Sequence, residues 1–307
     1  MKTTRRDFCV RSAGFLAASS LPWLAAPVRA STVTMGSASI SSFSDGMMVI
    51  PTDFLFETEG HPDIAAKLDA SGMGEGRAER PLNITYVEME DRKILFDAGS
   101  GVNFLPGLGE LPAALEEAEV DITEITDVIF THAHPDHIWG VLDDFDDLAM
   151  PDATYHMAEK EWDFWYSNAA LAAMPAGREN FAVGARSRME VMEDQVSLFA
   201  FGDEILPGIE AVDSTGHTPG HAAFALHQGS DSLMIIGDAL THPLISFENP
   251  EFRNLSDMDT ESAVASRLAL LDRMHADNMQ LIGYHLPAPG FGRVEKSGPS
   301  WRYIAAS

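Results

Sequence analysis

Residues 131–137 read Thr-His-Ala-His-Pro-Asp-His and stand at the end of an apolar run, Asp127–Thr131, that predicts a strand. Because residues two apart on an extended segment point the same way, His132 and His134 can bind one metal ion together. Asp136 and His137 diverge, and the proline before them is expected to turn the chain, so they can bind a second ion. Four ligand-type side chains within six positions predict a metal site rather than a solvated loop.

Three histidines and one aspartate cannot complete two coordination shells, so further ligands are required. Three candidates lie further along the chain, each directly after a strand-like run: His217, Asp238 and His285. A lone histidine at a strand end is more often a hydrogen-bonded core or surface residue. In this order, however, the seven residues predict that five imidazoles and two carboxylates converge around a pair of cations.

The rest of the chain alternates between strand-like and helix-like segments. Strands are predicted at 33–40, 83–88, 93–97, 209–213, 222–226, 233–236 and 280–284, and helices at 110–119, 157–173, 186–195 and 260–275. Turns are predicted at Ser44–Gly46 and Glu90–Arg92. This mixture predicts an α/β fold in which sheets are flanked by helices. No repeat or low-complexity linker divides the chain, so residues 31–307 are expected to form one domain.

The first thirty residues are typical of an export signal. Arg5 and Arg6 precede an apolar stretch, Ala13–Ala26, that is short for a membrane span, and small residues suit cleavage after Ala30. The Arg5–Phe8 run resembles a twin-arginine signal. We therefore expect a periplasmic or secreted protein with no stable membrane association after the signal is removed; an uncleaved anchor is the alternative.

Charge and cysteine content narrow the function. The formal net charge is −27, and it becomes −31 once the net four positive charges of residues 1–30 are removed. Such a surface repels phosphate backbones, so nucleic acid is not expected as a partner. The acidity itself indicates solubility rather than a particular substrate. The sole cysteine, Cys9, lies in the signal, so metals must be bound by nitrogen and oxygen.

The set of motifs resembles the metallo-β-lactamase superfamily. The resemblance consists of His-x-His-x-Asp-His at 132–137, Gly-His-Thr-Pro-Gly-His at 216–221, Gly237-Asp238 and the late His285, and it covers essentially the whole mature chain. It implies a four-layer αβ/βα sandwich with the site along one edge of the two sheets. The implied ligands are His132, His134 and His217 for the first metal, Asp136, His137 and His285 for the second, and Asp238 as the bridge.

A site of this composition is suited to hydrolysis. Two divalent cations, with zinc as the default, would leave a net positive centre that favours an oxyanion and activates a bridging hydroxide. Asp136 and Asp238 are the catalytic candidates, because Asp136 can orient the attacking oxygen or manage its proton. We expect a small-molecule substrate; a homodimer is left open.

The end of the chain narrows the resemblance further. Together with Gly237–Pro243 and the export signal, His285–Val294 is similar to the methyl parathion hydrolase branch, near the quorum-quenching lactonases. This implies lactone, ester or phosphotriester substrates. Two alternatives remain: a β-lactamase with only histidine and aspartate ligands, and a non-catalytic exported metal-binding protein.

Four residues near these motifs are not among the implied metal ligands, but they can shape the site. His221 and His242 can line the pocket or support a ligand. Trp139 can narrow the mouth of the pocket, and Phe291 can supply an apolar wall.

Overall fold

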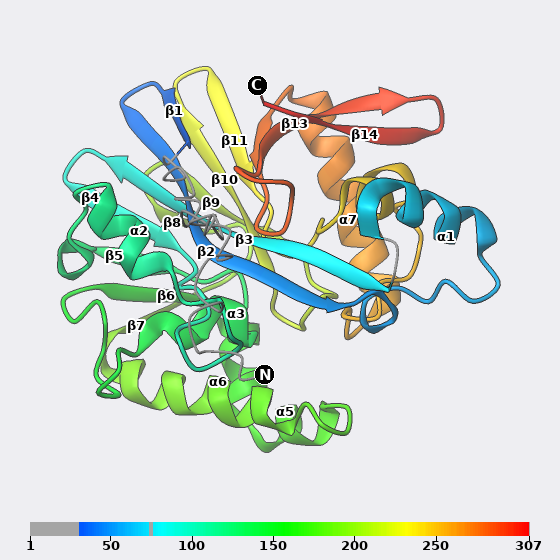
Figure 1. The fold of residues 1–307 in the computed structure, drawn as a ribbon. Coiled ribbons are helices and arrows are strands. Elements are labelled where there is room, and N and C mark those ends of the chain that lie inside the picture. Colours follow the sequence, from blue (N-terminus) through cyan, green and yellow to red (C-terminus); the bar gives the residue numbers. More distant parts are fainter. Residues whose placement is uncertain (1–30, 74–75, 307) are drawn as a thin grey trace, which may run out of the picture.

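Two seven-stranded sheets lie face to face in the computed structural model, which describes residues 31–73 and 76–306 (Figure 1). The predicted export signal falls outside the described residues. In spatial order the first sheet consists of β1 (Ser31–Met35), β2 (Ala38–Pro51), β3 (Arg77–Met89), β4 (Arg92–Phe96), β5 (Asp127–Ile129), β6 (Thr154–Ala158) and β7 (Val196–Phe199). β1 to β4 pair antiparallel, as a meander, and β4 to β7 pair parallel.

The second sheet runs in the reverse of the chain order. It consists of β14 (Ser300–Ala305), β13 (Phe291–Ser297), β12 (Gln280–Ile282), β11 (Asp231–Ile235), β10 (Ala222–Gln228), β9 (Ile209–Asp213) and β8 (Glu204–Leu206). Only β11 and β12 pair parallel. Apolar side chains from both sheets, such as Phe96 and Phe224, fill the space between them.

The helices are α1 (Pro62–Leu68), α2 (Leu111–Glu117), α3 (Pro135–Ile138), α4 (Glu159–Tyr166), α5 (Asn168–Ala173), α6 (Glu179–Met192) and α7 (Thr260–Ala276). Helices cover the outer face of each sheet, whereas α1 packs apart from them, against Leu55, Phe56 and Ile245. α2, α3, α4 and α6 pack on the first sheet and α7 packs on the second, which confirms the predicted four-layer αβ/βα sandwich. Among the described residues, none of these helices has the length and apolarity needed to cross a membrane.

The parallel strands bring the predicted ligands to one edge of the sandwich. The loop 131–137 follows β5 in the first sheet, while Asp238 follows β11 and His285 follows β12 in the second. Because β11 and β12 run in the same direction, their carboxyl ends lie at the same edge. Residues more than one hundred positions apart in the sequence therefore meet in space.

Two local predictions in the first sheet are wrong. The segment 33–40 is a hairpin rather than one strand, because Gly36 adopts φ of 57° and turns the chain between β1 and β2. Ser44–Gly46 is not a turn but an irregularity inside β2. Asp45 is buried there and accepts hydrogen bonds from the backbone N–H groups of Ser100 and Leu111. Its carboxylate therefore satisfies buried backbone donors and does not face solvent as a turn residue would.

The predicted helix 157–173 is also wrong in its bounds. Residues up to Ala158 belong to β6, and the helical part divides into α4 and α5 at Ser167. Ser167 has extended backbone angles, and its hydroxyl accepts from the N–H of Ala169 as the N-cap of α5. The predicted helix 186–195 begins earlier, at Glu179.

Candidate metal centre

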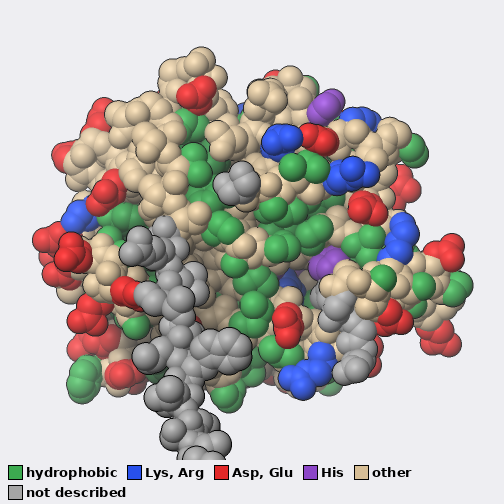
Figure 2. Space-filling model, turned by 45° about the horizontal axis from the view of Figure 1, so that its top comes forward, with side chains coloured by type: hydrophobic (Ala, Val, Ile, Leu, Met, Phe, Trp, Pro, Cys, Tyr) green, Lys and Arg blue, Asp and Glu red, His purple; other side chains and the backbone are tan. Residues whose placement is uncertain are grey.

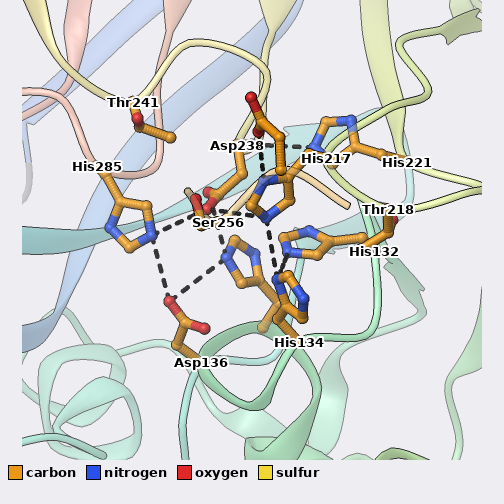
Figure 3. Close-up of polar contacts among 12 residues, drawn as sticks. His132, His134, Asp136, His217, Thr218, His221, Asp238, Thr241, Ser256 and His285 are labelled. Atoms are coloured by element: carbon orange, nitrogen blue, oxygen red, sulfur yellow. Dashed lines mark hydrogen bonds and ion pairs between the residues drawn. The ribbon is translucent and has the colours of Figure 1, made fainter. Parts of the chain in front are cut away.

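The structure brings all seven predicted ligands together. Figure 3 labels all of them except His137. Three groups have potential ligand atoms within 4.8 Å of one another: His132 with His134 and His217, Asp136 with His137 and His285, and His132 with His137 and Asp238. Every one of these residues except His134 is buried. The third group shares members with the other two, so Asp238 lies between two potential metal sites.

The first potential site is formed by three imidazoles. Nδ1 of His134 lies 3.0 Å from Nε2 of His132 and 3.0 Å from Nε2 of His217. A single nitrogen cannot supply hydrogens to two neighbours, so three ring nitrogens at this spacing suit a shared cation better than mutual hydrogen bonds. Burial, reinforced by the neighbouring imidazoles, lowers the pKa of His132 well below its ordinary value. Neutral imidazole is the form that binds a metal.

The second potential site is formed by one carboxylate and two imidazoles. Oδ2 of Asp136 lies 3.2 Å from Nε2 of His285 and 3.6 Å from Nε2 of His137. Asp238 reaches both sites: its Oδ1 lies 3.3 Å from Nε2 of His137, and its Oδ2 lies 3.3 Å from His285 and 3.5 Å from His217. This is the position expected of a bridging carboxylate.

Outer partners fix the orientation of these imidazoles. Nδ1 of His285 lies 3.0 Å from the carbonyl oxygen of Pro81, which can only accept, so the proton of this ring is on Nδ1. Nδ1 of His137 contacts buried Asp97 at 2.8 Å, and Nδ1 of His217 contacts Asp257 at 3.1 Å. In each ring Nε2 is the nitrogen that faces the site, where it can bind a metal.

Unpartnered atoms show that these residues fit a pair of cations. Nε2 of His137, Nε2 of His285 and Oδ1 of Asp238 are buried and form no hydrogen bond in the described structure. Lone pairs of imidazole and carboxylate turned toward one another repel unless a positive charge lies between them. A donor set of imidazole nitrogens and carboxylate oxygens suits a divalent cation such as zinc.

The electrostatics of Asp238 and His137 also favour bound cations at this site. Burial alone would raise the pKa of Asp238, but the charges of His285 and His137 lower it well below its ordinary value. For His137, burial is outweighed by Asp97, Asp136 and Asp238, which raise its pKa well above the ordinary value. The three carboxylates thus favour positive charge on this imidazole, and two of them, Asp136 and Asp238, face Nε2, where a bound cation would supply that charge.

A pocket of about 340 Å³ opens onto the predicted ligands. His134, Asp136, His217 and Asp238 form its floor. Its walls are mostly apolar, with four polar exceptions at Arg80, Arg178, Asn180 and Ser256; the apolar lining residues are Met48, Ile50, Pro51, Phe54, Leu55, Phe104, Leu105 and Phe181. An apolar chamber over a polar floor is typical of a small-molecule site.

The histidines that had no assigned role support the site from outside. His221 is fully buried, its Nε2 accepts from the backbone N–H of Asp238 at 3.0 Å, and its Nδ1 lies 2.7 Å from Oγ of Ser214. His221 therefore holds the Asp238 backbone in place. His242 caps a following helical turn through Ile245, and it lines a second cavity of about 730 Å³ with His285.

The two aromatic residues lie outside the lining of the pocket over the metal site. Trp139 packs edge-on to Phe104, which does line that pocket, and fills a gap left by Gly184 of α6. Trp139 therefore acts on the pocket through Phe104. Phe291, expected as an apolar wall, is buried in the core between the sheets, because β13 turns its side chain inward.

Four supporting residues were missed in the sequence: Arg80, Asp97, Glu161 and Asp257. Asp97 follows the strand β4 just as Asp238 follows β11, so its place at a strand end was a usable signal. For Arg80, Glu161 and Asp257 the sequence offers no comparable signal, because their roles depend on which loops meet in space.

Comparisons with known proteins agree with this geometry. The profile of the metallo-beta-lactamase superfamily matches residues 77–283. AidC, a dizinc quorum-quenching lactonase in complex with the product N-hexanoyl-L-homoserine, is 25% identical, with a TM-score of 0.83 over 91% of this chain and 97% of that chain. A comparison with curated proteins found no significant match.

Two further solved structures share the fold at lower identity. The hydrolase AbOPH of the beta-lactamase superfamily is 22% identical, with a TM-score of 0.83 over 91% of this chain and 97% of that one. A quorum-quenching N-acyl homoserine lactone lactonase is 16% identical, with a TM-score of 0.60 over 89% of this chain and 100% of that one. The chain therefore belongs to the metallo-β-lactamase superfamily, as a metal-dependent hydrolase.

Proposed function

We propose that this protein is an exported, dinuclear metal-dependent hydrolase that opens lactones and cleaves esters of small apolar molecules. In this proposal His132, His134 and His217 bind the first metal, Asp136, His137 and His285 bind the second, and Asp238 bridges them. Zinc is the proposed metal, because the ligands are imidazoles and carboxylates in sets of three around a shared carboxylate. A phosphotriester, whose cleavage develops a similar oxyanion, is a proposed secondary substrate.

One observation carries the proposal: buried lone pairs on His137, His285 and Asp238 face one another without a hydrogen bond. Each imidazole is held in that orientation by an outer partner at its Nδ1. An arrangement that repels itself without cations and opens into a pocket is suited to metal-assisted hydrolysis.

The chemistry divides between the cations and the protein. When bound, two divalent cations lower the pKa of a water molecule and polarise the oxygen of the scissile group. The imidazoles of His137 and His285 lower the pKa of Asp136, so its carboxylate is ionised and can orient that water or accept its proton. Asp136 is placed for this because it lines the pocket.

The pocket supports an apolar acyl group as the part of the substrate that is recognised. Aromatic and aliphatic side chains such as Phe104, Phe181 and Ile50 surround the metal-facing floor. Hydrophobic side chains also gather in a band across the face shown in Figure 2, with acidic side chains around its edges. The similarity to AidC, a lactonase captured with an acyl homoserine product, supports a lactone with an acyl chain.

We propose that the protein is exported and acts in the periplasm or outside the cell. The proposal rests on the twin-arginine-like run Arg5–Phe8 and the small residues before Ser31. An antibody-based assay of periplasmic and cytoplasmic fractions tests it, with Arg5→Lys/Arg6→Lys as the matched variant. Retention of the wild-type chain in the cytoplasm would refute export, whereas the proposed hydrolase activity does not depend on this result.

A substrate panel before and after chelation tests the activity. The panel contains an N-hexanoyl homoserine lactone, a chromogenic aryl ester, a phosphotriester and a β-lactam. We expect lactone and ester hydrolysis that disappears on chelation and returns when zinc is added. Hydrolysis that survives complete metal removal would contradict the mechanism. β-Lactam turnover alone would favour a β-lactamase, and two bound metals without any turnover would favour a metal-binding protein.

A further inference from the structure

Glu161 of α4 is a fully buried carboxylate that the proposed chemistry does not use. Its two oxygens accept four hydrogen bonds. Oε1 accepts from the backbone N–H of Ala133 at 2.9 Å and from Nε1 of Trp165 at 2.6 Å. Oε2 accepts from Oγ1 of Thr218 and from the backbone N–H of Gly220, both at 2.8 Å. No lysine or arginine of the described chain forms an ion pair with this carboxylate.

Three of these four donors come from the loops that carry the first metal site, and the fourth, Trp165, lies on α4 with Glu161. Ala133 lies between His132 and His134, and Thr218 directly follows His217. Each Glu161 oxygen therefore holds one of the two loops. The loops come from the two different sheets, so the carboxylate joins the halves of the sandwich at the point where the three imidazoles meet.

Two further contacts show how closely the structure is built around Glu161. A Cβ added at Gly220 would lie 2.1 Å from the backbone nitrogen of Glu161, so the loop approaches α4 as only glycine allows. The indole of Trp165, whose N–H donates to Glu161, meets the His134 ring edge-on with centroids 5.6 Å apart. Glu161 thus also fixes the wall against which His134 rests.

We infer that Glu161 is a positioning residue that sets the affinity and geometry of the first metal site, without binding the metal itself. A buried carboxylate with only neutral donors is stabilised by a nearby divalent cation, and it stabilises that cation in return. Its contacts go to the loops of His132, His134 and His217, whereas no Glu161 contact reaches Asp136 or His285 in the described structure. The effect is therefore selective for one of the two sites. This inference rests on the proposed metal centre.

Zinc titration of metal-free protein against a competing chelator tests the inference with Glu161→Gln. The amide replaces one acceptor oxygen with a donor, so one loop loses its hydrogen bonds while the side chain keeps its size. We expect the zinc affinity of one site to fall by about 10- to 100-fold, the range typical of residues that orient metal ligands, while the other site is unchanged. Glu159→Gln, an exposed acid on the same helix, is the matched control and should bind both zinc ions like wild type.

The visible spectrum of the cobalt-substituted protein gives a second readout that a merely structural role would not move. Glu161→Gln should alter the bands of one cobalt ion and leave those of the other. If Glu161→Gln does not fold, Thr218→Val removes a single donor, and a several-fold loss at one site is expected. Glu161→Gln with two wild-type zinc affinities would overturn the inference. A wild-type protein that binds no zinc would instead refute the proposed metal centre.

Discussion

Arg80 donates a hydrogen bond from Nη2 to Oδ2 of Asp238 at 3.2 Å, and the side chains are only 7% and 4% exposed. Asp238 is also the carboxylate that reaches both halves of the metal centre. Arg80 therefore supplies a permanent positive charge beside the residue on which both proposed sites depend. The guanidinium and the proposed cations stabilise the same buried carboxylate.

Replacement of Arg80 by glutamine should destabilise the metal-free protein more than the zinc-bound protein. Without zinc, loss of one member of a buried ion pair is expected to cost about 3–5 kcal/mol. With zinc bound, the cations still neutralise Asp238, so the loss should be smaller. Urea unfolding with and without a chelator measures the difference. Arg253→Gln, which removes an exposed pair with Glu57, should change little in either state; equal losses for Arg80→Gln in both states would contradict the shared role.

Asp238→Ala and His221→Ala should differ in their effect on bound metal, because Asp238 is a proposed ligand and His221 only holds the Asp238 backbone in place. Asp238→Ala removes the proposed bridge, so metal content and hydrolysis should fall together. His221→Ala loses the contact with the Asp238 backbone but no proposed ligand, so most of the bound metal should remain. Burial lowers the pKa of His221 to about 3, which keeps this support neutral near pH 7. Metal analysis that showed the reverse pattern would overturn the ligand assignment.

Gly184→Ala should overpack the wall behind the pocket. A Cβ at this position in α6 would lie 2.4 Å from Cζ2 of Trp139, so the indole must move. Overpacking of this kind costs about 1–3 kcal/mol, against about 1 kcal/mol gained in helix propensity. We expect a lower melting temperature and, because Trp139 contacts Phe104, a higher KM for acyl lactones. Trp139→Leu in the same chain should restore much of the stability; a stable Gly184→Ala variant with unchanged KM would refute this packing role.

His242 should make the metal-free protein less stable in mild acid. Burial, with a further contribution from Arg80, lowers the pKa of His242 from 6.5 to about 4. Below pH 6.5 the unfolded chain therefore binds a proton that the folded chain does not bind until about pH 4, so stability falls across this window. Between pH 7.5 and pH 5, His242→Gln should reduce that fall by up to about 2 kcal/mol in urea unfolding.

Exposed His61 provides the comparison for this pH effect. His61→Gln is the matched control for the loss of one histidine. An identical fall for wild type and His242→Gln would show that His242 does not contribute.

The sandwich fold and the convergence of the seven ligand positions could both be predicted from the sequence. Asp238 and His285 could be placed because each follows a strand, and parallel strands bring such positions to one edge. Local periodicity misplaced the start of the helix near Met157, which lies in β6, because a buried strand and a helix entrance look alike over a few residues.

The supporting residues could not be predicted in the same way. In the sequence, Glu161 cannot be told from an acid on a helix surface. Its burial depends on the loops around Ala133 and Thr218, which donate hydrogen bonds to it in the folded protein. Phe291 could supply an apolar wall by its sequence, but the direction of β13 turns its side chain into the core. Such roles are set by tertiary packing, which neighbouring residues in the sequence do not reveal.

Anomalous diffraction at the zinc edge from crystals of the zinc-loaded protein would locate the proposed metal ions themselves. We expect two peaks about 3.5–4 Å apart, one among His132, His134 and His217 and one among Asp136, His137 and His285, with Asp238 reaching both. Zinc-loaded crystals without a peak among these side chains, or with zinc bound only elsewhere, would contradict it.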